Sequence, residues 1–396
     1  MCRASKIFCA NERNKRPQWF SSAFPLLLPR APQIPVATNS TIMHRKIIIF
    51  ILGSGAIIAA GCHNATSPPV VTPSQFVVTA LTCDKATVGA YTAQNVDTNM
   101  HDAWGLAFNQ TYGFPWVANR ASGTLTIYDS LGVPKTTVFR VFGPGQKVGD
   151  PTGLIQNTAS QAFLVPSAGT NATWIASELN GTLAAVAGGS TYDSTYIVAD
   201  RSSSSSFTGL TEATVGGVPY LYAPNIRNGS LDQFDQNYTR VQFSNGLHTA
   251  QGYVPFNAVV IDTQLFVTEA KSASGFVAIG PGNGGYVDVY SLTGSFEKTL
   301  ITNDSLDSPW GVAIAPANFG SVSGDLLVGN FGDGTIHAYN RTTGAFVGTL
   351  NAASGSPIVI PGLWALVVYN NTLYVTAGPP GANGTYDGIF GKITLQ

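Results

Sequence analysis

Short apolar runs separated by glycine-rich turns recur along the chain and form six copies of one pattern. Each copy contains a doublet of a small or acidic residue and a glycine, and this doublet opens a strand. The final glycines of successive doublets lie 58, 48, 56, 49 and 54 residues apart, a period typical of propeller blades. The six doublets are Ser122-Gly123, Asn180-Gly181, Asn228-Gly229, Gly284-Gly285, Asp333-Gly334 and Asp387-Gly388.

The residues around each doublet predict the strands of one blade. A short apolar strand precedes the doublet, a strand opened by a turn and glycine lies further upstream, and a third strand with a polar-aromatic end follows. The run Leu326-Leu327-Val328 is apolar on both faces, as expected of a strand between neighbouring blades. The doublets have the chemistry of type I′ turns, in which both central residues adopt positive φ.

These strands predict an all-β fold, a six-bladed β-propeller of four-stranded antiparallel blades over residues 77–396. We expect residues 76–80, ahead of the first repeat, to supply the outer strand of the last blade and so to close the ring. The alternatives are a hairpin-rich β-sandwich, which does not explain a phase-locked repeat, and a ring of five or seven blades. A content of 43 glycines and 44% hydrophobic residues is typical of a turn-dense β protein with a sizeable core.

Residues 43–61 have the layout of a lipoprotein signal, with a basic start, an apolar run and small residues ahead of Cys62. We expect Cys62 to be lipidated, which would anchor the chain through acyl groups; a cleaved secretory peptide with an incidental cysteine is the alternative. His63 follows the cysteine, as in outer-membrane lipoproteins, and predicts an exported protein of the bacterial outer membrane, cell surface or periplasm. Residues 1–42 are then a mis-assigned or disordered extension, and the Pro-rich residues 62–76 are a flexible tether.

The balance of charged residues argues against one class of binding partner. Without the residues ahead of Cys62, 12 Lys and Arg stand against 20 Asp and Glu, so the mature chain is acidic. An acidic chain without a basic stripe argues against a nucleic-acid partner. We expect a monomer that contacts the membrane through the lipid at Cys62. Cys83 is the one cysteine left in the fold, so neither a disulfide nor a Cys-based zinc site can form within it.

Several motifs resemble those of an uncharacterised family of exported bacterial propeller proteins with NHL-like repeats. The similarity covers residues 78–396 and rests most on LLVGNFGDG at 326–334 and GLWAL at 362–366. The resemblance implies a propeller fold and an exported location, and it implies no reaction because the family has none assigned. The chain departs from the family pattern at His101-Asp102-Ala103 and at Arg120, which puts an inherited role for that first loop in doubt.

One polar position recurs directly after the strand that precedes each doublet, and such positions converge on the central funnel of a propeller. Sets of Asn and Glu oxygens suit a hard cation such as Ca²⁺, and they resemble the metal-binding cluster of propeller lactonases. The alternative is that these side chains cap turns. The candidate ligand or metal residues are Asn119, Glu178, Asn225, Glu269 and Asn330, and the sixth blade supplies only Ala377-Gly378.

Two functions are compatible with these patterns. The first is a lipid-anchored propeller that binds a protein or small-molecule ligand at one face of the ring, without catalysis. The alternative is a metal-dependent hydrolase, lactonase or lyase that uses Ca²⁺ as a cofactor in the funnel. Trp104, Trp310 and Trp364 recur at one position of the repeat, which indicates either packing between blades or a stacking platform for a ligand.

Overall fold

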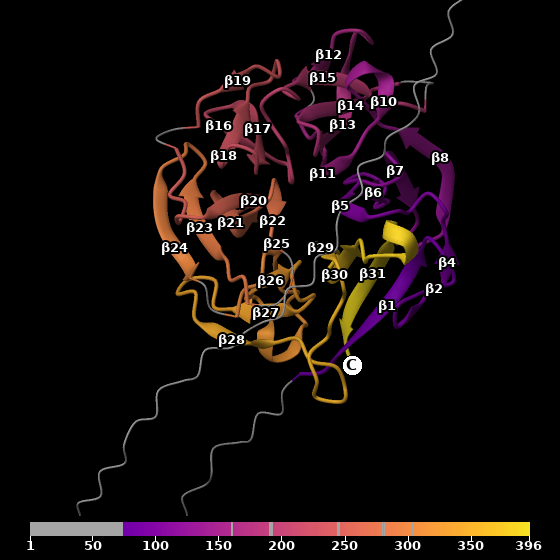
Figure 1. Ribbon diagram of the computed structural model, residues 1–396, viewed down its shortest axis with the longest axis vertical. Helices are drawn as coiled ribbons and strands as arrows, with labels where there is room; N and C mark the ends of the chain where they lie inside the picture. Colours follow the sequence, from indigo (N-terminus) through magenta and orange to yellow (C-terminus); the bar gives the residue numbers. More distant parts are fainter. Residues whose placement is uncertain are drawn as a thin grey trace, which may run out of the picture. The chain divides into compact units, whose positions relative to one another are not determined.

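Six antiparallel sheets are arranged in a ring around a common axis (Figure 1). The computed structural model describes residues 74–159, 161–189, 193–243, 246–278, 280, 282–302 and 305–396. The described part of the chain is a six-bladed β-propeller, as the repeat predicted. The signal, Cys62 and the tether up to residue 73 lie outside the described residues. No helix among the residues that the structure describes is long and apolar enough to cross a membrane.

Each blade consists of four sequence-adjacent strands, except the last. Blade 1 contains β5 (Ala103–Phe108), β6 (Pro115–Asn119), β7 (Thr124–Tyr128) and β8 (Pro134–Arg140). Blade 2 contains β11 (Pro151–Gln156), β13 (Thr170–Glu178), β14 (Thr182–Ala187) and β15 (Tyr196–Asp200). Blade 3 contains β16 (Thr211–Val215), β17 (Val218–Asn225), β18 (Ser230–Phe234) and β19 (Arg240–Val241). In each blade the first strand lies innermost (Figure 1).

The second half of the ring follows the same order. Blade 4 contains β20 (Tyr253–Ile261), β21 (Gln264–Ala273), β23 (Tyr286–Ser291) and β24 (Phe296–Thr302). Blade 5 contains β25 (Pro309–Ile314), β26 (Leu326–Asn330), β27 (Ile336–Tyr339) and β28 (Phe346–Thr349). Blade 6 contains β29 (Leu363–Tyr369), β30 (Thr372–Ala377), β31 (Ile389–Leu395) and, from the other end of the described chain, β1 (Phe76–Cys83).

Short strands and turns lie in the connections between the main strands. The two-residue strands are β2 (Thr87–Val88), β3 (Tyr91–Thr92), β4 (Asn95–Val96), β9 (Phe142–Gly143), β10 (Lys147–Val148), β12 (Leu164–Val165) and β22 (Phe276–Val277). Three 3-10 turns are η1 (Pro144–Gln146), η2 (Gly320–Val322) and η3 (Ala382–Gly384). The pairing of β22 with the end of β21 forms a hairpin extension of blade 4, and this extension has a role at the axis described below.

The ring is closed by β1, which pairs antiparallel with β31 from Phe76 opposite Leu395 to Cys83 opposite Ile389. This confirms the closure expected from residues 76–80 and lengthens the closing strand to Cys83. A parallel pairing with β4 then adds a fifth strand to this sheet. Phe76 and Cys83 are buried in the core between blades 5 and 6, so closure removes apolar surface as well as a free sheet edge.

Glycine at one position of the inner strands allows the blades to approach each other at the axis. Gly105, Gly153, Gly209 and Gly311 occupy this position in blades 1, 2, 3 and 5, with Asn257 and Ala365 in the other two. A Cβ added at Gly153 would lie 2.5 Å from the carbonyl carbon of Gly209 in the next blade. One added at Gly311 would lie 2.6 Å from the carbonyl oxygen of Trp364. The ring thus has no room for a side chain at these points.

Side-chain hydrogen bonds join neighbouring blades at the same level. The hydroxyl of Thr152 donates to the carbonyl of Phe207 (2.9 Å), and that of Thr208 donates to the carbonyl of Phe256 (2.7 Å). Asn257 Nδ2 donates to the carbonyl of Trp310 (2.9 Å). Because β-bulges interrupt the inner ladders here, these donors satisfy carbonyls that would otherwise be buried without a partner.

The turns at the doublets differ from the type I′ turns expected from their sequence. In Ser122-Gly123 and Asp333-Gly334 only the glycine has positive φ, at 64° and 75°. In blade 1 the connection between the strands is four residues long, and the N–H of Gly123 donates back to the carbonyl of Asn119, the last strand residue (3.0 Å). A four-residue loop places only its final residue in the left-handed region, so one glycine is sufficient.

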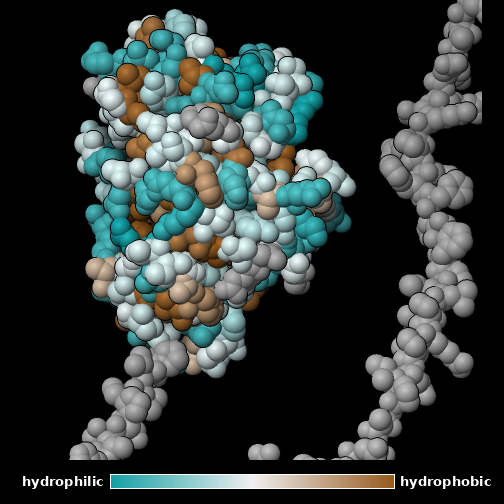
Figure 2. All heavy atoms as spheres, turned by 90° about the vertical axis from the view of Figure 1, so that its left-hand side faces the viewer, coloured by the Kyte–Doolittle hydropathy of each residue, from teal (hydrophilic) through white to brown (hydrophobic). Residues whose placement is uncertain are grey.

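The outer edge of the ring over blades 3 and 4 is largely hydrophilic, with apolar residues scattered among polar ones (Figure 2). The apolar residues are instead collected between adjacent blades. The cluster between blades 4 and 5, for example, packs Val287 and Val289 against Leu326 and Val328, all of them fully buried. Strands that are apolar on both faces therefore lie between two sheets, as the run at 326–328 predicted.

We expect the substitution Gly153→Ala to lower the free energy of unfolding by about 2 kcal/mol or more, because its Cβ overlaps the backbone of the next blade. Urea denaturation measures this change. Gly348→Ala is the matched control: Gly348 lies in β28, has ordinary φ, and nothing lies within 4 Å of an added Cβ. The control should change stability by less than about 0.5 kcal/mol. Equal effects of the two substitutions would show that the close approach of blades at the axis does not exclude a Cβ at residue 153.

Candidate functional site

Aromatic side chains from four of the six blades lie at the axis. The residue before the axial glycine position is Trp104, Phe256, Trp310 or Trp364 in blades 1, 4, 5 and 6, and it is threonine in blades 2 and 3. The rings of Trp104 and Trp364 stack with centroids 3.6 Å apart and planes inclined by 11°. Phe331 stacks on Trp364 at 4.0 Å. The tryptophans therefore do pack between blades, and together they build an aromatic floor.

A cavity of about 400 Å³ opens above this floor. Phe276 belongs to the hairpin of β21 and β22, and its ring meets Trp104 edge-on at 6.3 Å. It also meets Phe331 edge-on at 6.4 Å, so the hairpin covers one side of the opening. We call this cavity the axial pocket; it is lined by Asp102, Trp104, Arg120, Leu179, Phe276, Phe331, Gly332, Asp333, Val359, Pro361, Gly362, Trp364, Gly378, Pro380 and Tyr386.

One ion pair stands in this largely apolar lining. Arg120 Nε donates to Asp102 Oδ2, and the backbone N–H of Arg120 donates to the carbonyl of Asp102 (3.0 Å). The other carboxylate oxygen of Asp102 accepts from the indole N–H of Trp364 (3.0 Å). Burial raises the pKa of Asp102, and Arg120 and Trp364 oppose this shift because they stabilise the charged form. Asp102 thereby links Arg120 to the aromatic floor.

The three indole N–H groups at the axis differ in their partners. Trp364 donates to Asp102, and Trp310 donates to the carbonyl of Thr208 across the axis (2.8 Å). The Trp104 N–H is buried and has no partner among the residues that the structure describes. A buried donor without a partner carries a desolvation cost, and Trp104 is one of the residues that line the pocket.

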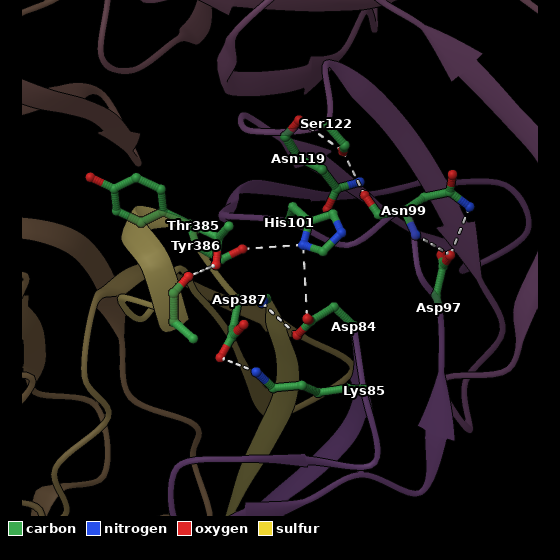
Figure 3. A network of polar contacts seen from close by, with 12 residues as sticks. Asp84, Lys85, Asp97, Asn99, His101, Asn119, Ser122, Thr385, Tyr386 and Asp387 are labelled. Atoms are coloured by element: carbon green, nitrogen blue, oxygen red, sulfur yellow. Dashed lines mark hydrogen bonds and ion pairs between the residues drawn. The ribbon is translucent and has the colours of Figure 1, made fainter.

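A polar network beside the pocket joins blade 6 to blade 1 (Figure 3). His101 Nδ1 lies 3.1 Å from the carbonyl of Tyr386 and 3.8 Å from Asp84 Oδ2. Asp84 Oδ1 accepts from the N–H of Gly388 (3.0 Å), and burial raises the pKa of Asp84. These contacts fix the loop that carries Asp102 against the turn that carries Tyr386, so the rim of the pocket is held from both sides.

The five residues predicted to enter the funnel are all fully buried, and none of them lines the axial pocket. Each makes hydrogen bonds within or next to its own blade. Asn119 Nδ2 donates to the hydroxyl of Thr126 (2.9 Å), and Glu178 Oε1 accepts from the hydroxyl of Thr182 (2.7 Å). The remaining partners follow the same pattern: Asn225 accepts from the N–H of Ser206, Glu269 from that of Ala250, and Asn330 from that of Asp307.

In four blades the pocket is instead lined by the residue that follows this position of the repeat, whereas Ile226 and Ala270, after Asn225 and Glu269, do not line it. Arg120, Leu179, Phe331 and Gly378 line it in blades 1, 2, 5 and 6, directly after Asn119, Glu178, Asn330 and Ala377. Successive side chains alternate along a strand, so a shift of one residue exchanges the packed face for the open one. The departures from the family pattern at Asp102 and Arg120 were the sequence signal that marked the pocket.

The five positions lie in the second strands of five different blades, and no group of three or more His, Cys, Asp or Glu among the described residues could hold a metal. Glu178, Asn225 and Asn330 accept hydrogen bonds from nearby groups, whereas Asn119 Oδ1 and Glu269 Oε1 are buried without a partner among the described residues. Burial raises the pKa of Glu178 to about 7 and that of Glu269 to about 8, with nearby Asp288 adding to the second shift. Carboxyl groups of this kind hold a proton near neutrality. The predicted Ca²⁺ site has no direct support from this geometry.

The chain is similar to uncharacterised viral proteins. One protein of Acanthamoeba polyphaga mimivirus is 29% identical over 323 residues, which cover 76% of each chain. A second from the same virus is 30% identical over 181 residues, which cover 44% of this chain and 48% of the relative. This chain therefore spans about half the length of the second relative. No known protein family model matches the chain.

Solved structures with a similar fold include enzymes. Virginiamycin B lyase from Staphylococcus aureus aligns with 81% of this chain and 100% of its own, at a TM-score of 0.47 and 10% identity. A gluconolactonase from Xanthomonas campestris aligns with 75% of this chain and 88% of its own, at a TM-score of 0.45 and 11% identity. Similarity at this level assigns no chemistry to the present chain.

The raised pKa of Glu269 predicts a pH-dependent stability. Because its pKa is about 8 in the folded state and near 4.5 when unfolded, the folded chain binds the extra proton, and stability falls as pH rises from about 5 to about 8. In Glu269→Gln the free energy of unfolding should fall less over this pH range, by on the order of 2–3 kcal/mol, as measured by urea denaturation. Glu297→Gln, at an exposed glutamate of β24, is the control and should keep the wild-type slope. An unchanged slope in Glu269→Gln would contradict a neutral buried Glu269.

Proposed function

We propose that this chain is an exported, lipid-anchored β-propeller that binds a small, flat and largely apolar molecule in the axial pocket. The observation that carries the proposal is the asymmetric axis: aromatic rings from blades 1, 4, 5 and 6 line the axial pocket, whereas Thr152 and Thr208 of blades 2 and 3 do not. Pockets of several hundred Å³ with apolar walls and few polar groups are typical of small-molecule sites. The export and the anchor at Cys62 rest on the sequence of residues 43–62.

The size of the pocket sets the scale of binding. A bicyclic aromatic ring that buries about 200 Å² gains roughly 5 kcal/mol at about 25 cal/mol per Å². Association costs of several kcal/mol are offset in part by ring stacking and by the rigid walls. A simple ring without polar groups should therefore bind with a dissociation constant of about 0.1–1 mM. Tighter binding would require use of the polar groups at the rim.

The binding of 2-naphthalenemethanol, a neutral bicyclic probe, tests the proposal by equilibrium dialysis. We expect saturable binding to the wild type and a loss of about tenfold or more in Phe276→Ala, because that ring forms one wall. Phe346→Ala is the control, since Phe346 is exposed on the outer strand of blade 5. Unsaturable binding, or equal effects of the two substitutions, would refute a site in the axial pocket.

A thermal melting series with Ca²⁺ separates this proposal from the metal-dependent hydrolase or lyase. The candidates lie in five different blades, and no group of three or more His, Cys, Asp or Glu among the described residues could hold a metal, so we expect the unfolding midpoint to be unchanged by Ca²⁺. A rise in the midpoint that disappears in Glu178→Gln would favour the metal-dependent alternative. Magnesium serves as the control for a general effect of divalent ions on an acidic chain.

A further inference from the structure

Two donors of the axial pocket lack partners among the described residues, and the lining also contains the carboxylate of Asp333, whose Oδ1 accepts from the hydroxyl of Thr335. Arg120 uses Nε on Asp102, and neither of its terminal amino groups has a hydrogen-bond partner among the described residues. Trp104 contributes a buried N–H without a partner. The carboxylate of Asp102, by contrast, has a protein donor on each oxygen. What these buried groups lack is an acceptor, and the two amino groups of a guanidinium match the two oxygens of a carboxylate.

Arg120 is held in place before any ligand binds. Its Nε is fixed by Asp102, its backbone N–H by the Asp102 carbonyl, and its guanidinium lies 4.8 Å above the ring of Tyr386. Its side chain is only 21% exposed. A guanidinium that is already oriented and partly dehydrated loses little freedom when it binds an anion, and it acts in a medium of low dielectric.

Asp102 carries a buried charge at a turn that recurs in the repeat. It adopts positive φ (53°), as do Ser308 (50°) and Gly362 (67°), which also stand two residues before an axial tryptophan. What distinguishes Asp102 is a carboxylate that is 2% exposed and that the guanidinium of Arg120 compensates.

Resting on the proposed function, we infer that the ligand of the axial pocket is an organic acid, with a flat apolar body on the aromatic floor and a carboxylate on the terminal amino groups of Arg120. The N–H of Trp104 is a further donor in the lining of the same pocket. Asp102 is a positioning residue in this arrangement, since it acts on the ligand through Arg120.

Paired probes test this inference: naphthalene-2-carboxylate and 2-naphthalenemethanol share one ring system and differ in charge. By isothermal titration calorimetry the wild type should bind the carboxylate about tenfold or more tightly than the alcohol. Arg120→Gln should bring the two affinities together by weakening the carboxylate alone. Arg240→Gln is the matched control, since Arg240 pairs with the buried Asp232 in blade 3 (2.9 Å), outside the pocket; it should retain the preference.

Loss of Arg120 leaves Asp102 buried without its cation, so the single variant can lose stability. The double variant Asp102→Asn/Arg120→Gln keeps neutral hydrogen-bonding groups at both positions and should still bind the alcohol saturably but show no preference for the acid. Equal affinities in the wild type, or a preference that persists in the double variant, would overturn the inference and leave ring binding intact. Failure of both probes to bind up to their solubility limits would overturn ring binding and the inference together.

Discussion

Six inner strands converge on one axis, and they fit because four of them carry glycine where the next blade comes closest. An added Cβ at Gly153 or Gly311 would overlap backbone atoms of the next blade, which cannot move aside as a flexible side chain can. This spacing places the preceding residue of each inner strand on the axis. The aromatic floor, the inter-blade hydrogen bonds of Thr152 and Thr208, and the depth of the pocket all follow from it.

The axis is asymmetric because the six equivalent positions carry different residues. Three tryptophans and a phenylalanine come from four blades, and two threonines come from the remaining two. The threonine hydroxyls are consumed in holding neighbouring blades together, so they add no free polar groups to the pocket. The hairpin of β21 and β22 then brings Phe276 over the large rings. Although the backbone repeat is regular, aromatic side chains at the axis come from blades 1, 4, 5 and 6 and not from blades 2 and 3.

Much of the fold could be predicted from the sequence, because glycine spacing and strand patterning repeat with every blade. The blade number, the closing strand at Phe76 and the packing of the tryptophans between blades are confirmed. The axial pocket lies one residue along from the positions named from the repeat: Asn119 bonds within its own blade, whereas Arg120 lines the pocket. Whether a given end residue faces the axis depends on strand register and bulges, which are long-range features. The extension that carries Phe276 has no counterpart in the other repeats, so periodicity could not reveal it.

The stacking of Trp104 on Trp364 has a consequence beyond packing. Two indoles with centroids 3.6 Å apart and nearly parallel planes are close enough for their electronic transitions to couple. Such a pair behaves as one chromophore, and its circular dichroism depends on the separation and twist of the two rings. One ring belongs to blade 1 and the other to blade 6, so their coupling depends on how the closing blade meets the first. Trp116 and Trp174 stack at 4.3 Å between blades 1 and 2 and contribute to the same spectrum, so the circular dichroism of this protein depends on both neighbours of blade 1.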